Sequence, residues 1–291
     1  MKLYNILVDN QIHLAAESGR GIIDLSAAGF EGDMDELIRG ACRAEIEKLL
    51  ADESLPTVTE PVYANIMNKV GKLVCVGLNY KAHAEGIEMK LPEYPILFSK
   101  FDNALAPAGA SVVLPPWENS YDYEAELVIV MGKDCWNVGE DEAMDYVFGY
   151  SCGNDFSLRD AQMRSGQWLI GKTMPGFGPC GPCIVTADEY DPNEGKAVRS
   201  YVNGQLRQNG TTADMIFSCA KIISYASRYI KLCPGDMIFT GTPSGVALEE
   251  SVKHWLRPGD VVDGDRGHRH TEKYTDIKQN GALRINKKAS H

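Results

Sequence analysis

The chain has 291 residues, 44% of them hydrophobic, which suits one large domain with an appendage or two domains. Its formal net charge of −11 excludes attraction to a nucleic-acid backbone or an anionic membrane through net charge. No apolar run approaches the roughly 20 residues of a membrane span. The amino-terminal sequence lacks a signal-peptide core, so we expect the eight cysteines to be reduced thiols in a cytoplasmic protein.

Residues 1–60 are predicted to form a small α+β domain. Apolar runs separated by turn residues predict three short strands, over residues 3–8, 12–15 and 22–25. A helix is predicted over 34–51, since Asp33 and Glu36 have capping-box spacing and apolar residues recur on one face. We interpret residues 53–59 as a linker.

Residues 70–262 are predicted to form a larger, β-rich catalytic domain. Extended segments are expected over residues 72–77, 96–98, 123–131, 148–155, 181–186 and 236–240. Helices are predicted over 140–147 and from Thr212 or Asp214 to 230. Residues 78–95 are polar and rich in turn formers, which is typical of a loop or short helix that can act as a lid. Residues 263–291 are expected to be a polar tail, partly disordered or peripheral.

The segment 123–131 organises the rest of the chain. Glu124 and Glu126 lie two positions apart on a predicted strand, so their carboxylates project from the same face. Two like charges at the start of an apolar strand resist burial unless a positive charge lies between them. A divalent cation with oxygen ligands would supply that charge. The alternative is an exposed strand end with solvated acids.

Further polar residues follow the predicted strand 148–155. Asp155 lies at its end, and three acids from two strands can form one side of an octahedral metal site. Arg159 and Gln162 lie four and seven residues later, so a helix would place all three on one face. Lys172 is a candidate cation for a substrate carboxylate or a developing enolate. Taken singly, each charge is also typical of a solvated surface.

An ordered set of motifs closely resembles the fumarylacetoacetate hydrolase family over about residues 70–262. The residues that carry the resemblance are Gly77-Leu78-Asn79-Tyr80-Lys81-Ala82-His83, Phe98-Ser99-Lys100, Tyr123-Glu124-Ala125-Glu126-Leu127, Asn154-Asp155, Arg159-Asp160, Gln162, Gly171-Lys172, Val202-Asn203-Gly204, Gly235-Asp236 and Thr240-Gly241-Thr242-Pro243-Ser244-Gly245-Val246. The resemblance implies an α+β, β-rich fold of rolled mixed β-sheets, usually dimeric, preceded by a small amino-terminal domain. It also implies a bound Mg2+ or Mn2+ ion.

The resemblance assigns roles to residues around that ion. It places the metal ligands at Glu124, Glu126 and Asp155. It gives Lys172 a substrate contact near the metal. We expect further substrate contacts from four residues, Lys100, Arg159, Gln162 and Thr242.

The catalytic base is the point at which this sequence departs from the family. Hydrolases of the family use a lid histidine with a glutamate three residues later, and His83 fits the histidine. Position +3 is Gly86, and the nearby acids are Glu85 and Glu88. On an ideal helix neither acid repeats the required geometry, but a non-helical lid would let Glu85 reach His83. Glu85 is therefore our predicted partner.

Three functions follow from these residues. The first is a metal-dependent hydrolase that cleaves a C–C bond of a small 2,4-dioxo carboxylate through a metal-stabilised enolate. The second is a tautomerase or isomerase, a decarboxylase or a dehydratase of a related 2-keto acid such as oxaloacetate or a 2-keto-3-deoxy sugar acid, which the glycine at position 86 favours. The third is a non-catalytic relative, which the complete acid set disfavours. A homodimer with a small-molecule substrate, and no nucleic-acid or membrane partner, is expected in each enzymatic case.

Three weaker features lie outside this scheme. Cys180 and Cys183 have the spacing of a redox motif but are interpreted as ordinary thiols flanking a turn. His268 and His270 are interpreted as a solvated pair in the polar tail. The strand that begins near 261 has no visible continuation, so the closing part of the sheet is predicted to be altered or lost.

Overall fold

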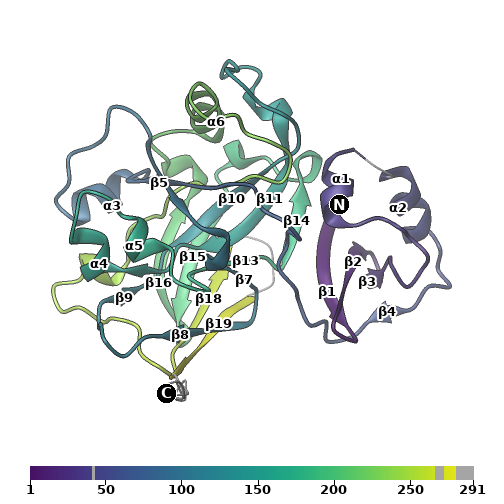
Figure 1. The fold of residues 1–291 in the computed structure, drawn as a ribbon, viewed down its shortest axis with the longest axis horizontal. Coiled ribbons are helices and arrows are strands. Elements are labelled where there is room, and N and C mark those ends of the chain that lie inside the picture. The colour runs from purple at the N-terminus through teal and green to yellow at the C-terminus, as the bar shows by residue number, and fades with distance from the viewer. Residues whose placement is uncertain (41–42, 266–271, 280–291) are drawn as a thin grey trace, which may run out of the picture.

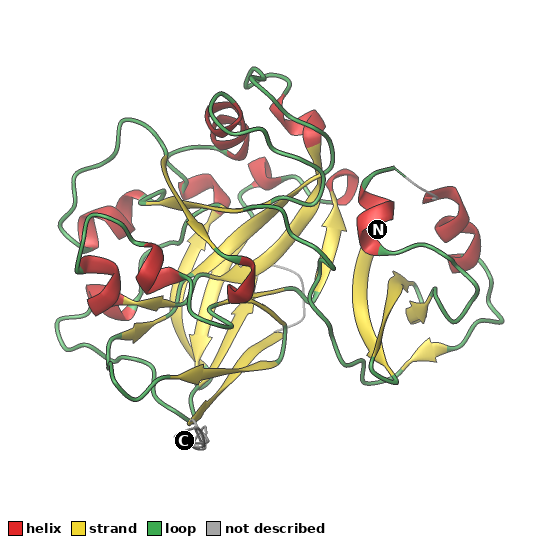
Figure 2. Cartoon of the chain, viewed as in Figure 1, coloured by secondary structure: helices red, strands yellow, loops and turns green. Residues whose placement is uncertain are grey.

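The computed structural model describes residues 1–40, 43–265 and 272–279. Within these residues the chain forms one twelve-stranded sheet, one five-stranded sheet and a two-stranded ribbon. Short helices lie around their rims (Figures 1 and 2). The predicted α+β, β-rich class is confirmed. No helix in this part of the chain is long and apolar enough to cross a membrane.

The amino-terminal unit contains the three predicted strands and a fourth. These are β1 (Lys2–Val8), β2 (Gln11–Ser18), β3 (Gly21–Asp24) and β4 (Thr57–Val58), the last inside the expected linker. The single predicted helix is wrong, because the chain forms α1 (Met34–Ile38) and α2 (Arg43–Leu50). Gly40, with φ of 99°, takes a left-handed conformation between them. The capping box of Asp33 and Glu36 is confirmed.

The large sheet runs through both predicted domains. Its strand order is β4-β3-β2-β1-β14-β11-β10-β17-β5-β6. The strands not yet bounded are β5 (Leu73–Gly77), β6 (Ile96–Lys100), β10 (Ala125–Met131), β11 (Val147–Asn154), β14 (Cys183–Thr186) and β17 (Met237–Phe239). Two short strands, β7 (Leu105–Pro107) and β13 (Gly178–Cys180), pair beside this path. The antiparallel pairing of β1 with β14 makes the amino-terminal strands an extension of this sheet. The domain boundaries stay a prediction.

Strand β10 lies inside the sheet, and all its residues are buried. Leu127 and Ile129 pack in one hydrophobic cluster, whereas Val128 and Val130 pack with Phe239 in another. The predicted alternation of faces along this segment is therefore confirmed.

The smaller sheet corrects the expectation for the carboxyl-terminal segment. Its strand order is β16 (Gln205–Thr211), β15 (Ala197–Val202), β18 (Val261–Asp265), β19 (Glu272–Gln279) and β8 (Ala110–Leu114). β19 pairs antiparallel with β18 and parallel with β8, so the closing strand is present. Its sequence is mostly polar and lacks the apolar pattern that predicts a strand, but backbone pairing does not require apolar side chains. The ribbon pairs β9 (Tyr121–Asp122) with β12 (Ser157–Leu158).

The helices of the larger unit are shorter than predicted. The α-helices are α3 (Lys81–Gly86), α4 (Arg159–Met163), α5 (Leu169–Lys172) and α6 (Cys219–Ser227). The 3-10 turns are η1 (Asp102–Ala104), η2 (Ala143–Tyr146), η3 (Ala187–Glu189), η4 (Pro192–Glu194), η5 (Thr212–Asp214) and η6 (Ala247–Glu249). The helix predicted over 140–147 is only η2. The helix predicted from Thr212 begins after Ser218, because Ile216 donates its N–H to the Asn79 carbonyl instead of continuing a helix.

Candidate active site

Three buried carboxylates meet where β10 begins and β11 ends. Glu124 immediately precedes β10, Glu126 lies on it, and Asp155 directly follows β11. Ala125 pairs with Asn154 across the two antiparallel strands, which brings these chain ends together. One carboxylate oxygen from each acid lies within 4.8 Å of the others. The predicted side-by-side placement of these acids is confirmed.

Three basic side chains surround the carboxylate cluster. Lys172 Nζ lies 2.8 Å from Glu124 Oε2 and 2.9 Å from Asp155 Oδ2. Lys100 Nζ lies 2.5 Å from Asp155 Oδ1, and Arg159 Nη2 lies 2.7 Å from Glu124 Oε1. All three cations are buried, so their charges act in a medium that screens them weakly.

The carboxylates differ in their proton affinity. Burial opposes ionisation of Glu124, but the charges of Lys172 and Arg159 outweigh it and hold its pKa below the usual value. Burial, reinforced by Asp155 and Glu124, raises the pKa of Glu126 well above the usual value. Glu126 accepts a hydrogen bond from the Gly241 N–H at 2.8 Å. A further positive charge would relieve this repulsion, so the oxygen donor set fits a divalent cation.

A histidine and a glutamate face each other near this cluster. His83 on α3 has its Nδ1 2.5 Å from Glu249 Oε1, which comes from η6. The other Glu249 oxygen accepts the Gly245 N–H at 2.6 Å. The expected contact between Glu85 and His83 is wrong. The α3 segment is helical, so residues two apart diverge, and Glu85 lies near Lys81 with 59% of its side chain exposed.

The glycine at position 86 makes room for Glu249. A Cβ on Gly86 would lie 3.0 Å from both Cγ and Cδ of Glu249. The acid absent from position +3 is thus replaced in space by one from a distant segment. Sequence reasoning missed Glu249, although it lies just beyond the Thr242 loop that the motifs had singled out.

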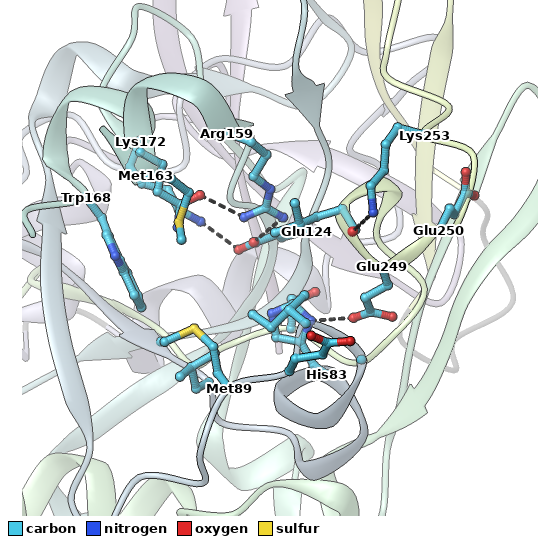
Figure 3. Close-up of a pocket in the computed structure, with 18 of the residues that line it drawn as sticks. His83, Met89, Glu124, Arg159, Met163, Trp168, Lys172, Glu249, Glu250 and Lys253 are labelled. Carbon is cyan, nitrogen blue, oxygen red and sulfur yellow. Dashed lines mark hydrogen bonds and ion pairs between the residues drawn. The ribbon is translucent and has the colours of Figure 1, made fainter. Parts of the chain in front are cut away.

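His83, Glu249 and Glu124, the last from the carboxylate cluster, line one cavity of about 400 Å³. Figure 3 shows His83 and Glu249 on one side of it and Arg159, Lys172 and Glu124 around another part. Glu124 and Lys172 reach the cavity wall, so a small acid bound there would lie near the carboxylate cluster.

The other predicted substrate residues have distinct positions. Arg159 Nη1 donates to Gln162 Oε1 at 2.9 Å, and both line the cavity. Asp155 does not share their helix, because α4 begins at Arg159, so the expected common face is wrong. Thr242 lines the cavity and donates its hydroxyl to the Ala125 carbonyl at 2.8 Å.

Lys100 stabilises the carboxylate cluster from outside the cavity. It donates to the carbonyls of Lys172, Phe156 and Phe177 and pairs with Asp155, and it is not among the residues that line the cavity. A direct substrate contact is therefore not supported for this lysine.

Sequence reasoning also missed Asp122. Its buried carboxylate accepts from Arg159 Nε at 2.8 Å and from the N–H groups of Ala247 and Leu248 at 2.8 and 3.1 Å. One side chain thus ties the cavity arginine to the turn that carries Glu249. In the sequence, its position next to the Tyr123-Glu124-Ala125-Glu126 motif was the feature that could have indicated a role at this site.

The remaining candidates lie elsewhere. Cys180 and Cys183 are buried thiols on β13 and β14, on either side of the Gly181-Pro182 turn. His268 and His270 lie outside the described residues.

Comparison with known proteins identifies the class. Residues 72–268 match the model of the fumarylacetoacetate (FAA) hydrolase C-terminal domain, which is more than half of the chain. The chain therefore belongs to the fumarylacetoacetate hydrolase family.

Individual relatives extend this likeness. The chain is 46% identical over 204 residues to a fumarylacetoacetate hydrolase domain-containing protein 2 homolog of Dictyostelium discoideum, covering 66% of this chain and 67% of that protein. It is 39% identical over 260 residues to a mitochondrial oxaloacetate tautomerase of Xenopus laevis, covering 87% and 81%. A solved fumarylacetoacetate hydrolase from Exiguobacterium antarcticum superposes with a TM-score of 0.83 at 28% identity, covering 96% and 100%.

Proposed function

We propose that this chain is a metal-dependent enzyme that interconverts the enol and keto forms of a small 2-oxo carboxylate such as oxaloacetate. The observation that carries the proposal is the His83–Glu249 pair, which lines the same cavity as Glu124 of the carboxylate cluster. The likeness to the Xenopus oxaloacetate tautomerase over most of both chains supports the choice of reaction.

The metal is proposed to be Mg2+ or Mn2+, held by Glu124, Glu126 and Asp155. Hard oxygen donors suit both ions. When bound, the ion would act as a Lewis acid towards the oxygens of a 2-oxo acid.

His83 is proposed to move the proton. Glu249 accepts the hydrogen on Nδ1, which leaves the Nε2 lone pair free to take a proton from the substrate carbon or to return it. The negative carboxylate also stabilises the imidazolium that forms. Lys172 supports the same step, because Asp155 and Glu124 outweigh its desolvation and raise its pKa, which keeps the ammonium charged beside a developing oxyanion.

Arg159 and Gln162 are proposed to orient the substrate. Their mutual hydrogen bond and the Asp122 contact fix the guanidinium at the cavity wall. A substrate that is already oriented loses little further translational and rotational entropy on reaching the transition state. This effect supplies a large part of the rate acceleration by an enzyme.

Hydrolysis of a 2,4-dioxo carboxylate is the second candidate. The glycine at position 86, where hydrolases of the family have a glutamate, counted against hydrolysis in the sequence. Glu249 supplies the missing carboxylate beside His83. His83 with this partner could activate a water molecule, and the likeness to the Exiguobacterium hydrolase supports that reaction.

The two reactions separate in one assay series. Purified protein with Mg2+ is expected to accelerate the loss of ultraviolet absorbance of enol-oxaloacetate without releasing carbon dioxide or a shorter acid. Glu249→Gln should remove most of this acceleration, whereas Glu85→Gln, on the exposed face of α3, should retain it. Cleavage of acetylpyruvate to acetate and pyruvate, with no effect on enol-oxaloacetate, would establish the hydrolase instead. Inactivity towards both acids would overturn the proposal.

The proposal also includes the oligomeric state and the cellular location of the protein. We propose a homodimer, which light scattering during size-exclusion chromatography would test. We propose a cytoplasmic location, with the mitochondrial Xenopus relative as the contrary precedent; fractionation of the source cells would decide between them.

A further inference from the structure

One wall of the cavity is built from large apolar side chains. Its members are Ile87, Met89, Phe98, Met163 and Trp168, which we call the apolar wall. In Figure 3, Trp168, Met163 and Met89 lie on the side of the cavity away from Glu249, Glu250 and Lys253. The cavity therefore has a charged side and an apolar side.

The aromatic part of the wall is held in place. The Trp168 ring lies against Gly77, where an added Cβ would come within 2.3 Å of the ring. The same indole packs edge-on against Phe98 at 5.3 Å between centroids and 68° between planes. Phe98 in turn lies beneath the Lys172 ammonium, 5.2 Å from its ring centroid. The apolar wall thus begins beside Lys172, at the carboxylate cluster, and extends away from it.

The rest of the wall is exposed to the cavity and adaptable. Met163 is 58% exposed and Met89 is 38% exposed, although large apolar side chains gain free energy from burial. Methionine is flexible and polarisable, so it can adjust to a ligand surface. Exposed apolar groups clustered beside a reactive site are typical of ligand contact rather than of solvent exposure alone.

The charges near the wall favour an uncharged occupant. Lys172 and Arg159 are already paired with buried acids, and Lys253 donates to the Leu248 carbonyl on the opposite side. None of the five residues of the wall is basic, so a second carboxylate placed there would lose hydration without a partner. The volume of about 400 Å³ also exceeds the needs of a four-carbon acid, since sites of about 300–1,000 Å³ hold drug-sized ligands.

We propose that the apolar wall binds the aryl or branched alkyl group of a 2-oxo acid whose carboxylate and keto oxygens lie at the metal site proposed in the carboxylate cluster. Phenylpyruvate is the simplest member of this substrate class. The inference rests on the proposed tautomerase function and deepens it. In ketonisation Nε2 of His83 takes the proton of the enol hydroxyl, the C–C double bond becomes the keto C=O, and the imidazolium returns the proton to the carbon that bears the aryl group. Atoms and charge balance without another reactant.

The test compares enol-phenylpyruvate with enol-oxaloacetate in the Mg2+-loaded full chain. Wild-type protein should convert phenylpyruvate with a kcat/KM at least equal to that for oxaloacetate. Trp168→Ala should lower kcat/KM for phenylpyruvate roughly 10- to 100-fold, the usual range for lost apolar contacts, and change that for oxaloacetate less than about threefold. Met163→Gln, at an exposed position that does not threaten folding, should lower only the phenylpyruvate value.

Trp136→Ala is the matched control, since Trp136 is 58% exposed and lies outside the residues that line the cavity. It should leave both substrates unchanged. Turnover of oxaloacetate with no substrate-selective loss in the Trp168 and Met163 variants would overturn the apolar-wall inference alone. Turnover of neither acid by wild-type protein would overturn the proposed function on which it rests.

Discussion

Replacement of Gly86 should slow catalysis without weakening the fold. Gly86 ends α3, and its φ is not in the left-handed region, so alanine fits the backbone. Alanine is a better helix former than glycine by about 1 kcal/mol, so the free energy of unfolding of Gly86→Ala should be unchanged or slightly higher. The unfavourable effect of the substitution is instead a steric contact with the side chain of Glu249.

The magnitude follows from the contact distances. An added Cβ would lie 3.0 Å from Cγ and Cδ of Glu249 and 3.3 Å from Oε2, whereas carbon atoms pack best at about 3.5–4.0 Å. Glu249 must therefore shift by roughly 0.5 Å, although His83 and the Gly245 N–H hold it on both sides. A misplacement of about 1 Å can cost about 100-fold in rate, so we expect kcat to fall about tenfold, or about 1.4 kcal/mol of barrier. Gly86→Leu should cost more.

A double-mutant cycle distinguishes this steric route from a general effect on the lid. Ketonisation of enol-oxaloacetate would be measured for Gly86→Ala, Glu249→Ala and the double variant. If the glycine acts through Glu249, the alanine at 86 should add little loss once the Glu249 carboxylate is gone. Additive losses in kcat, or a Gly86→Ala enzyme with wild-type kcat, would refute the reasoning. Urea unfolding of each variant supplies the stability control.

Three further predictions concern the charged residues around the carboxylate cluster. Asp122→Asn should cost roughly 1.5–3 kcal/mol in the free energy of unfolding, because it removes one of the two carboxylates that pair with the buried Arg159, the other being Glu124. Glu118→Gln, which removes the exposed pair with Arg164, should cost less than about 1 kcal/mol, and an equal loss in urea for both would contradict this. Mg2+ should stabilise the protein by about 2.7 kcal/mol at 100 times its dissociation constant, seen as a rise in Tm. Because the pKa of Glu126 is raised, the metal-free fold loses stability as the pH rises past the ordinary glutamate value, since only the unfolded chain ionises there. Metal binding needs the ionised carboxylate, so the Mg2+-induced rise in Tm should be larger at about pH 8 than at about pH 5. A rise independent of pH would argue against Glu126 as a ligand.

Local pattern was enough to place the carboxylates. Glu124 and Glu126 share a strand face because side chains alternate along a strand, and the apolar run that follows them predicts burial. Asp155 was placed at a strand end by the same reasoning. The order of the motifs along the chain then identified the family.

Helix lengths were less predictable from the sequence. Residues 212–230 have a helical apolar stripe, but Ile216 and Met215 pair with the segment at Asn79 and Tyr80, which delays α6 until Ser218. Tertiary hydrogen bonds of this kind override local propensity.

The partner of His83 depended on the tertiary structure alone. Spacing along α3 pointed to Glu85, but a helix turns that side chain towards solvent. Glu249 lies 166 residues further along the chain, and no local periodicity records such a contact. Residue identities and alternation thus determined the carboxylate cluster, which two neighbouring strands build from their own geometry. The His83–Glu249 pair instead required the packing of α3 against η6, because its two residues become neighbours only when distant segments fold together.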